Sequence, residues 1–383
     1  MRVFILAGEP SGDKLGGALM AGLKTLRPDV QFDGIGGPEM AAQGLVSRFD
    51  MSELSVMGLA EILPKYRHLK RRIRETAQAV VETRPDVLIT IDSPDFSLRV
   101  ARLVKEKSSI RTVHYVAPTV WAWRPKRAAK MARCVDHVLA LFPFEPPLMQ
   151  AAGMACDFVG HPVVAEPVAT KAQAQAFRTE TGIDDAPMLL VLPGSRRGEV
   201  GRLADTFGAA LRDVLGKRPD MRVVLPAADP VAQLVSEVTR DWPGAPLVLD
   251  PRGQDRLAFM AQKRAAFRAA DVALAASGTV SLELAASATP MVIAYDMSWL
   301  SRQIISRMLL VDTVTLVNLV SETRAVPEFI GEKCQPGPIA AAIADVLANP
   351  DLQDQAMAVT MERLGQGNEA PGLRAARSVL HRM

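Results

Sequence analysis

The strongest constraint on the fold of this chain is a repeated alternation of short apolar runs with longer amphipathic segments. The apolar runs are rich in β-branched residues, which is typical of strands buried inside parallel sheets. They cover residues 3–7, 31–35, 86–91, 112–116, 138–141 and 156–159, and then 188–192, 222–226, 246–249, 272–275 and 291–295. Helical segments at 12–26, 38–43 and 94–106 separate the early strands. This alternation predicts an α/β fold with two Rossmann-like, doubly wound, mostly parallel sheets.

A polar, alanine-rich stretch at about 166–185 separates the two alternating halves. The 383 residues exceed the usual size of one domain, so about two domains are expected. We therefore predict an N-terminal domain over residues 1–165 and a C-terminal domain over residues 166–349. The tail over residues 338–383 is predicted to be helical, with breaks at Asn349-Pro350 and around residues 365–367.

The composition is that of a soluble globular protein, with 49% hydrophobic and 23% charged residues. No stretch approaches the ~18 apolar residues of a membrane span, and Glu9 and Asp13 follow the first apolar run too closely for a signal peptide. A net charge of +3 is too small to indicate nucleic acid binding. The three cysteines, Cys134, Cys156 and Cys334, lack metal-ligand spacing, and their odd number argues against a disulfide framework. A reducing cytoplasm fits best.

Asp92 lies where a predicted buried strand gives way to a helix. Ser93 can cap this helix, Pro94 suits its first position, and Asp95 is favoured in its positive first turn. Asp92 is then left free at the carboxyl end of the strand, where open α/β sheets bind ligands. It is a candidate general base. A structural hydrogen bond to a neighbouring loop amide is the equal alternative.

Two loops in the second half suit a nucleotide diphosphate. The loop after residues 188–192 contains Ser195 and the cations Arg196 and Arg197, which can form charge-assisted forks. The loop after residues 272–275 offers free amides at Ser277, Gly278 and Thr279, with Glu283 one turn into the next helix as an acceptor for ribose hydroxyls. Each loop alone could be an ordinary strand-to-helix turn, and their coincidence at neighbouring strand ends favours a binding site.

The first loop of the chain, residues 7–13, resembles a nucleotide-binding turn without matching G-x-G-x-x-G. Glu9 and Asp13 would repel a phosphate, so this loop, with Ser11 and Gly12, suits sugar hydroxyls better. The same holds for the glycine-rich segment at 34–40.

A basic cluster without acids occupies residues 65–74 and follows a largely apolar segment at 56–63. Such a pairing suits an anionic lipid surface. Charge alone favours the plainer alternative, a core-facing loop followed by a solvated helix. The candidate surface residues are Val56, Met57, Leu59, Ile62, Leu63, Lys70, Arg71 and Arg72.

Together these segments closely resemble the lipid-A-disaccharide synthase family, bacterial inverting glycosyltransferases of the GT-B type. The motifs occur in order along nearly the whole chain, and the set is far more specific than any one of them. They are GEPSGD (8–13), GIGGPEM (34–40), SVMGLAE (55–61), IDSPDF (91–96), HYVAPTVWAWRPKR (114–127), FVGHP (158–162), LPGSRRGE (192–199), SGTVSLE (277–283), TLVNLV (315–320) and VPEFIG (326–331). Val317 departs from the pattern, because proline is common at this position in the family.

The resemblance implies a reaction and a fold. UDP-2,3-diacylglucosamine would donate its sugar to the 6-hydroxyl of 2,3-diacylglucosamine 1-phosphate, giving the β-1,6-linked lipid A disaccharide 1-phosphate and UDP with inversion. The two domains would face a cleft, and C-terminal helices over 350–383 would cross back to the first domain. The UDP-sugar is a substrate, so neither a cofactor nor a metal is expected.

The resemblance also implies roles for single residues. Asp92 matches the family's proposed catalytic aspartate, and Arg196, helped by Arg197, would stabilise the departing UDP. Glu283 and Asn318 would join Ser195, Ser277, Gly278 and Thr279 at the donor site. The acceptor or sugar side would include Glu9, Ser11, Gly12, Asp13 and Trp121, although a core position for Trp121 is at least as well supported.

Because both substrates carry acyl chains, the resemblance makes the lipid-surface interpretation of residues 56–74 the favoured one. It implies a cytoplasmic enzyme peripherally bound to the inner membrane of a Gram-negative bacterium. A homodimer is compatible with the family, and the sequence does not determine the oligomeric state. Two rivals remain: another GT-B enzyme with a different acceptor, and a non-catalytic lipid-binding adaptor. Turnover distinguishes them.

Overall fold

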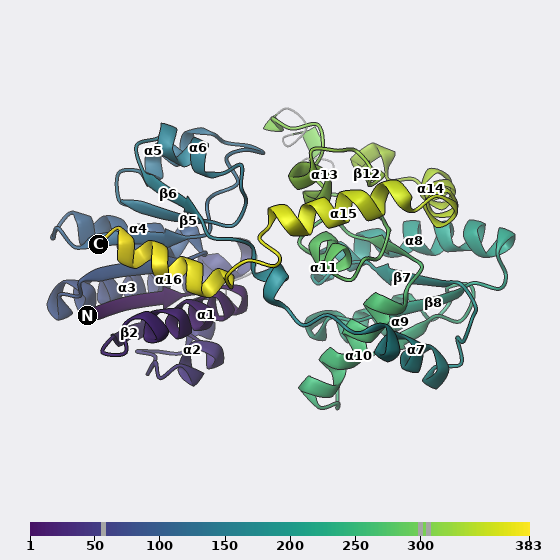
Figure 1. Ribbon diagram of the computed structural model, residues 1–383, viewed down its shortest axis with the longest axis horizontal. Coiled ribbons are helices and arrows are strands. Elements are labelled where there is room, and N and C mark those ends of the chain that lie inside the picture. Colours follow the sequence, from purple (N-terminus) through teal and green to yellow (C-terminus); the bar gives the residue numbers. More distant parts are fainter. Residues whose placement is uncertain (55–58, 298–301, 304–307) are drawn as a thin grey trace. The chain divides into compact units, whose positions relative to one another are not determined.

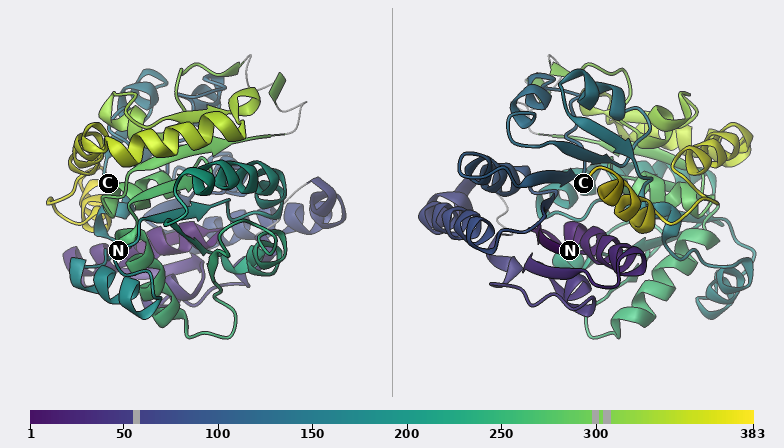
Figure 2. Two further views of the ribbon diagram at one scale, coloured as in Figure 1. Left: turned by 90° about the vertical axis from the view of Figure 1, so that its right-hand side faces the viewer. Right: turned by 60° about the vertical axis from the view of Figure 1, so that its left-hand side comes forward.

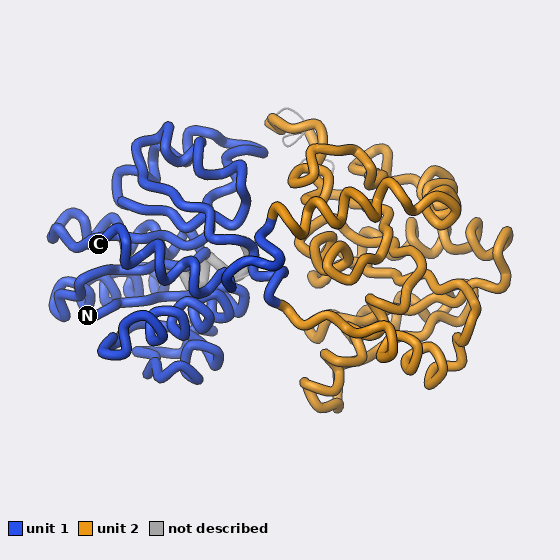
Figure 3. The backbone as a smooth tube through the Cα atoms, in the orientation of Figure 1, with its two compact units in different colours: residues 1–165, 364–383 blue, residues 166–363 orange. Residues whose placement is uncertain are grey.

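The computed structural model describes residues 1–54, 59–297, 302–303 and 308–383, with side chains left out at 59–66 (Figure 1). The chain divides into two compact units. Unit 1 contains residues 1–165 and 364–383, and unit 2 contains residues 166–363 (Figure 3). Each unit contains one six-stranded parallel sheet, which confirms the predicted α/β fold class.

The sheet of unit 1 has the strand order β2-β1-β3-β4-β5-β6. Its strands are β1 (Arg2–Ala7), β2 (Gln31–Ile35), β3 (Val87–Ile91), β4 (Arg111–Tyr115), β5 (His137–Ala140) and β6 (Ala155–Phe158). The helices are α1 (Pro10–Leu26), α2 (Pro38–Ala42), α3 (Leu59–Thr83), α4 (Pro94–Lys105), α5 (Lys126–Met131), α6 (Pro146–Ala151) and α16 (Pro371–His381), with short 3₁₀ helices η1 (Met51–Leu54) and η2 (Pro162–Ala165). The strand order reverses between β1 and β3, which is where open sheets of this kind form a ligand crevice.

The sheet of unit 2 repeats this order as β12-β11-β10-β7-β8-β9. Its strands are β7 (Met188–Leu192), β8 (Arg222–Pro226), β9 (Leu247–Leu249), β10 (Val272–Ala275), β11 (Met291–Tyr295) and β12 (Glu328–Ile330). The helices are α7 (Lys171–Glu180), α8 (Arg197–Lys217), α9 (Ala232–Val238), α10 (Arg256–Ala269), α11 (Val280–Ala286), α13 (Leu316–Ser321), α14 (Pro336–Ala348) and α15 (Asp351–Arg363), with η3 (Asp229–Val231) and η4 (Gly331–Lys333). The sequence prediction missed β12, because its three half-buried residues form no apolar run.

The central strands owe their positions to burial on both faces. Every residue of β3 and of β7 is buried, as their uninterrupted apolar sequences predict. In unit 2 the core continues into α8 and α14, where Phe207 and Ile339 are fully buried in one cluster with Leu189 of β7. Burying apolar surface contributes about 25 cal/mol per Å², so these central strands hold the loops at their carboxyl ends in place.

The C-terminal segment returns to unit 1 later than the sequence predicted. Helix α15 stays with unit 2, because Thr360 and Arg363 donate hydrogen bonds to the carbonyls of Val317 (3.3 Å) and Val320 (2.7 Å). Only residues 364–383 belong to unit 1, which corrects the expected start at 350. These contacts are long-range, so the sequence break at Asn349-Pro350 could not reveal them.

Helix α16 packs along α1, as the adjacent yellow and purple helices of Figure 2 show. The absence of a side chain at Gly22 lets the two helices approach closely. A Cβ atom there would lie only 2.6 Å from the Gly372 carbonyl oxygen. At the end of the chain Arg382 forms a bidentate ion pair with Asp157 at 2.6 and 2.7 Å, which holds the pKa of that carboxyl well below its usual range. Across the described residues, no helix combines the length and the apolarity needed to cross a membrane.

Candidate functional site

Unit 2 contains a cavity of about 800 Å³ at the carboxyl ends of its central strands. Leu192 ends β7, Pro226 ends β8 and Ala276 follows β10, and all three residues line it. The cavity brings together six of the residues predicted for a nucleotide donor, namely Ser195, Arg196, Ser277, Gly278, Thr279 and Glu283. Two further predicted residues, Arg197 and Asn318, do not line it.

The loop before α8 is shaped by a carboxylate. Gly194 has φ +117°, a conformation that favours glycine, and a Cβ there would lie 2.7 Å from Glu199 Oε2. Glu199 Oε2 accepts hydrogen bonds from the amides of Ser195 (3.1 Å) and Arg196 (3.3 Å). Its other oxygen pairs with the Arg196 guanidinium at 3.2 Å. Glu199 was not among the residues predicted for this site, although a glutamate three residues after a helix cap signals this arrangement.

The loop before α11 leaves its amides available. The backbone N–H groups of Ser277, Gly278 and Thr279 have no hydrogen-bond acceptor within the described part of the chain. Gly278 has φ +152°, and a Cβ there would meet nothing within 4 Å, so the backbone conformation rather than crowding requires glycine. Successive free amides at a turn form a concavity that suits an anion.

Helix α10 forms a wall of this cavity that the sequence analysis did not assign to the site. Phe259, Lys263 and Phe267 recur every fourth residue and all line the cavity, a spacing that places side chains on one helix face. Lys263 Nζ lies 2.8 Å from Glu283 Oε2, and it also lies 5.0 Å from the centre of the Phe267 ring. Glu283 therefore enters the cavity as half of an ion pair rather than as a free carboxylate.

Asn318 has a structural position instead of the predicted donor-site position. Its side chain is fully buried, and its Nδ2 donates to the carbonyl of Val326 (2.9 Å) and to Thr313 Oγ1 (3.3 Å). Its Oδ1 accepts from the Val326 amide at 3.0 Å. Two of these hydrogen bonds join α13 to Val326 before β12 and the third joins it to Thr313, so both N–H donors of the side chain are used within the protein.

Unit 1 contains a second cavity of about 360 Å³, with Asp92 in its lining. Asp92 follows β3 and its amide donates to the Tyr115 carbonyl at the end of neighbouring β4 (3.0 Å). Three non-glycine residues around this junction have positive φ: Asp92 (+47°), Ser93 (+44°) and Val116 (+86°). For a β-branched valine this is a real outlier. Backbone strain of this kind is concentrated at functional sites, since the surrounding fold must hold it in place.

The Asp92 carboxylate has no hydrogen-bond or ion-pair partner among the residues that the structure describes. Ser93 precedes α4 as predicted, but its side chain makes no capping hydrogen bond. Its backbone is in the αL conformation, and its carbonyl accepts the first hydrogen bonds of the helix from the amides of Phe96 (3.0 Å) and Ser97 (2.9 Å). Pro94 occupies the helix start and Asp95 lies in the first turn, both as predicted.

His114 lines the same cavity and is buried. Its Nδ1 lies 2.7 Å from Thr90 Oγ1. Burial lowers the pKa of His114 to about 4, so the imidazole is neutral at physiological pH. This agrees with a hydrogen-bonded structural histidine more than with a proton carrier.

The first loop of the chain lies against the Asp92 turn. Gly8 permits this approach, since a Cβ there would lie 2.7 Å from Ser93 Oγ. Glu9 and Ser11 are exposed at the start of α1, whereas Gly12 is buried beside Ile91.

The side chains of Asp13 and Trp121, both predicted for the acceptor or sugar side, are engaged in contacts within unit 1. The buried Asp13 carboxylate accepts from the amides of Gly37 (2.7 Å), Glu39 (2.9 Å) and Met40 (3.1 Å), so it shapes the loop before α2 instead of presenting a free carboxylate to a sugar. Trp121 is half-buried and packs edge-on against Phe144 at 5.3 Å between ring centres.

Part of the predicted lipid surface lies outside the described residues. This applies to Val56 and Met57 altogether and to the side chains of Leu59, Ile62 and Leu63. Lys70 and Arg71 are exposed on α3. Arg71 pairs with Glu75 one turn further along at 3.5 Å.

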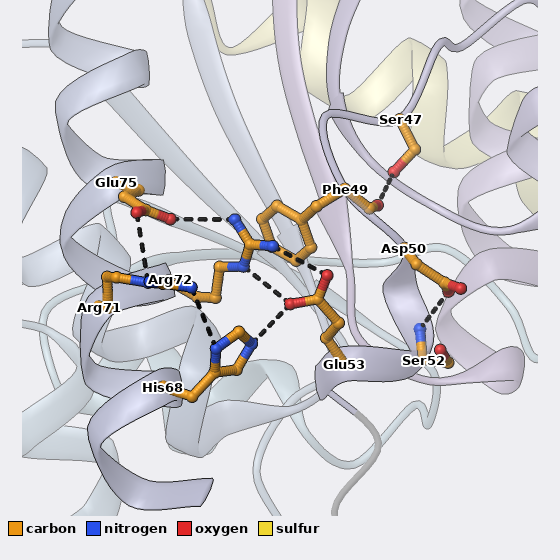
Figure 4. A network of polar contacts seen from close by, with 9 residues as sticks. All are labelled: Ser47, Phe49, Asp50, Ser52, Glu53, His68, Arg71, Arg72 and Glu75. Carbon is orange, nitrogen blue, oxygen red and sulfur yellow. Dashed lines mark hydrogen bonds and ion pairs between the residues drawn. The ribbon is translucent and has the colours of Figure 1, made fainter.

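Arg72 is committed to a polar network within unit 1 (Figure 4). Its Nε and Nη2 each lie 2.8 Å from the Glu53 carboxylate, and its Nη1 lies 3.0 Å from Glu75. The guanidinium also lies 4.4 Å from the centre of the Phe49 ring. Arg72 therefore ties η1 to α3, which differs from the predicted surface role.

Comparisons with known proteins agree on fold and family. The chain is 68% identical over 383 residues to a lipid-A-disaccharide synthase of Ruegeria pomeroyi, covering 100% of this chain and 96% of that protein. It is 46% identical over 385 residues to the enzyme of that name from Rhodospirillum centenum, covering 99% and 94%.

Solved structures show the same fold at low sequence identity. A UDP-GlcNAc 2-epimerase from Neisseria meningitidis, bound to UDP-GlcNAc, matches with a TM-score of 0.63 and 12% identity over 100% of this chain and 99% of that one. An epimerase from Methanocaldococcus jannaschii, in complex with UDP-GlcNAc and UDP, matches with a TM-score of 0.61, 12% identity and the same coverage. The sequence profile described as lipid-A-disaccharide synthetase matches residues 3–379, and the chain therefore belongs to this family of glycosyltransferase-type enzymes.

Proposed function

We propose that this enzyme transfers 2,3-diacylglucosamine from UDP-2,3-diacylglucosamine to the 6-hydroxyl of 2,3-diacylglucosamine 1-phosphate. The products are the β-1,6-linked lipid A disaccharide 1-phosphate and UDP. The observation that carries this proposal is the family match over residues 3–379, supported by 68% identity to a lipid-A-disaccharide synthase along the whole chain. The two cavities supply chemistry that suits the two substrates.

The cavity of unit 2 is assigned to the UDP-sugar. A diphosphate carries negative charge that increases as the glycosidic C1–O bond breaks, so its binding site must offer positive groups and N–H donors. Arg196 and the free amides of Ser277, Gly278 and Thr279 line the cavity and supply both. These groups support departure of UDP without a metal ion, and we propose a metal-independent reaction with no cofactor.

We assign the ion pair of Lys263 and Glu283 to the ribose of the UDP-sugar. Lys263 is paired with Glu283 at 2.8 Å, so it is already held at the cavity wall before any ligand binds. A ribose hydroxyl can accept from the ammonium and donate to the carboxylate at the same time. The ion pair thus offers both kinds of hydrogen bond that a ribose diol requires.

Asp92 is assigned as the general base for the acceptor. In a single displacement, the acceptor O6 attacks C1 of the donor while its proton passes to the Asp92 carboxylate. The new C1–O6 bond forms on the face opposite the C1–O bond to UDP, which breaks with its electron pair and inverts the anomeric configuration. The Asp92 carboxylate suits this step, because it lies at the carboxyl end of a strand and no described residue forms a hydrogen bond or ion pair with it.

We further propose that the enzyme works peripherally on the cytoplasmic face of the inner membrane. Acyl chains hold both substrates in a bilayer, so the enzyme must reach them there. Lys70, Arg71 and Arg74 are exposed on α3, and each such cation near an anionic surface adds about 1 kcal/mol. A homodimer is compatible with the family.

The test is an assay of purified protein with UDP-2,3-diacylglucosamine, in which UDP release and disaccharide are both measured. Reactions contain or omit the acceptor 1-phosphate, each with and without EDTA. We expect acceptor-dependent disaccharide that persists in EDTA. Loss of product in EDTA would refute the metal-independent mechanism. Absence of product from folded protein in all arms would favour another transferase of this fold or a non-catalytic lipid binder.

A further inference from the structure

The cavity next to Asp92 has a cationic rim that the proposed function has not used. Four basic residues line it, two from α4 and two from α5. They are Arg99, Arg102, Arg127 and Lys130. Asp92 is the one acidic residue among the described residues of the lining. The pairs 99/102 and 127/130 are each spaced three apart, so each pair lies on one face of its helix.

These cations are poorly neutralised by the protein itself. Arg99, Arg127 and Lys130 have no ion-pair partner in the described part of the chain. Arg102 contacts Glu106 at 3.7 Å, and both side chains are more than half exposed, so this pair contributes little. A small cavity with this excess of positive charge concentrates anions.

The rest of the lining is apolar. Leu98, Val116 and Met131 lie in the same cavity wall as the cations. A ligand that fits must therefore combine an anionic group with an apolar portion, and it must also bring a group to the Asp92 carboxylate. The strained backbone at Asp92 and Val116 lies at this cavity, which points independently to a functional site.

We propose that this cationic rim binds the phosphate of the acceptor, and thereby orients the acceptor's hydroxyl toward Asp92. This inference rests on the proposed function, because that function names an anionic amphiphile as the acceptor. One sugar ring separates the 1-phosphate from the 6-hydroxyl, and one cavity of about 360 Å³ offers cations for the first and a carboxylate for the second. The donor needs no such contact, since its phosphates are assigned to unit 2.

The test compares two acceptors in nonionic detergent micelles, which contain no anionic lipid. One is 2,3-diacylglucosamine 1-phosphate and the other is the corresponding methyl glycoside, in which a methoxy group replaces the phosphate. The variant is Arg99→Gln/Lys130→Gln. The matched control is Lys107→Gln/Arg133→Gln, which removes two positive charges from neighbouring exposed positions outside the cavity.

We expect the cavity variant to raise KM for the phosphorylated acceptor roughly 10- to 100-fold, because hydrogen bonds to a charged group are lost. KM for the methyl glycoside and for the donor should stay unchanged, and the control should resemble the wild type with every substrate. An equal change for both acceptors, or no change, would overturn the proposal. So would a defect seen only on phosphatidylglycerol vesicles, because the cations would then contact the bilayer.

A binding measurement separates failure of this inference from failure of the proposed function. Calorimetry compares N-acetylglucosamine 1-phosphate with uncharged N-acetylglucosamine as probes. If the wild type makes no disaccharide but prefers the phosphorylated probe, and the cavity variant loses that preference, the anion site stands while the proposed function fails. If the wild type makes disaccharide but shows no preference for the phosphorylated probe, the anion site is refuted.

Discussion

Glu199 places a carboxylate oxygen 3.1 Å from the amide of Ser195, at the loop that the sequence analysis assigned to a diphosphate. The carboxylate has two opposing effects there. It holds the loop in shape through two amides, and it brings a negative charge to the edge of a proposed anion site.

Two substitutions at Glu199 separate these effects. Glu199→Gln keeps an oxygen for the amides and removes the charge, so UDP should bind at least as tightly as to the wild type. Glu199→Ala removes both, and we expect weaker UDP binding together with a loss of about 1 kcal/mol of stability from the lost cap. Calorimetric titration with UDP and thermal melting measure the two quantities. Equal UDP affinities in the two variants would show that the loop-shaping hydrogen bonds do not matter for UDP, and affinities equal to the wild type in both would show that the charge does not matter either.

Arg196 and Arg197 form a natural test pair, because only Arg196 lines the cavity. Arg196→Ala should weaken UDP binding by about tenfold, since a charge-assisted hydrogen bond to the diphosphate is lost. Arg197→Ala removes the same charge one residue away and should leave the UDP dissociation constant near the wild-type value. If both variants bind UDP alike, the assignment of Arg196 is wrong.

Asp92→Asn should leave UDP affinity unchanged and lower turnover roughly 10²- to 10⁴-fold, because an amide cannot take the proton of the attacking hydroxyl. Asp95→Asn is the control, since this exposed residue lies in the first turn of α4 and does not line the cavity. The rate of disaccharide formation at saturating substrates is the measurement. Near-normal turnover of Asp92→Asn would remove it as the base.

The basic segment of α3 contains two kinds of cation. Charge reversal at the exposed pair Lys70 and Arg71 should reduce co-sedimentation with anionic vesicles while leaving the melting temperature unchanged. Arg72→Ala should instead lower stability by roughly 1 kcal/mol, because Glu53 loses its bidentate partner. Vesicle binding that survives reversal of Lys70 and Arg71 would support a solvated helix without a lipid-binding role.

His161 should make stability depend on pH. Burial lowers its pKa from 6.5 to about 4, and its Nδ1 accepts from the Val163 amide at 3.1 Å. As pH falls from 6.5 toward 4, the unfolded chain binds the proton first, so stability is lost over this range and is fully present above it. From pH 7 to 5 the loss should approach about 2 kcal/mol for this one group.

His161→Gln isolates this contribution, because glutamine can still accept from the amide and does not titrate. The fall in melting temperature between pH 7 and 5 should be smaller in the variant than in the wild type. Identical falls would show that His161 does not carry the effect. Glu145 acts in the opposite direction in both proteins, since burial raises its pKa to about 7.

The sheet strands and the loops after them could be predicted because their signals are local. An uninterrupted apolar run such as residues 188–192 has few alternatives to a buried strand, and parallel strands bring their carboxyl ends to one edge. Ser195, Arg196, Ser277 and Thr279 could therefore be placed together from sequence. The role of Glu199 also has a local signal, because a glutamate three residues after the helix cap is typical of such a cap.

The amino-acid sequence alone determined the fold class, the family and the neighbourhoods of Asp92 and Arg196, because these follow from residue order and backbone periodicity. Only the tertiary structure decided which polar side chains are already occupied. Asp13 and Asn318 look like ligand-binding residues in a motif, yet each is buried and hydrogen-bonded within the protein, Asp13 to backbone amides more than 20 residues away and Asn318 to Val326 and Thr313. The cationic rim was likewise hidden, since Arg99 and Lys130 converge on one cavity only when α4 and α5 pack on the same sheet. Burial and hydrogen-bond saturation depend on these long-range contacts, which no local pattern encodes.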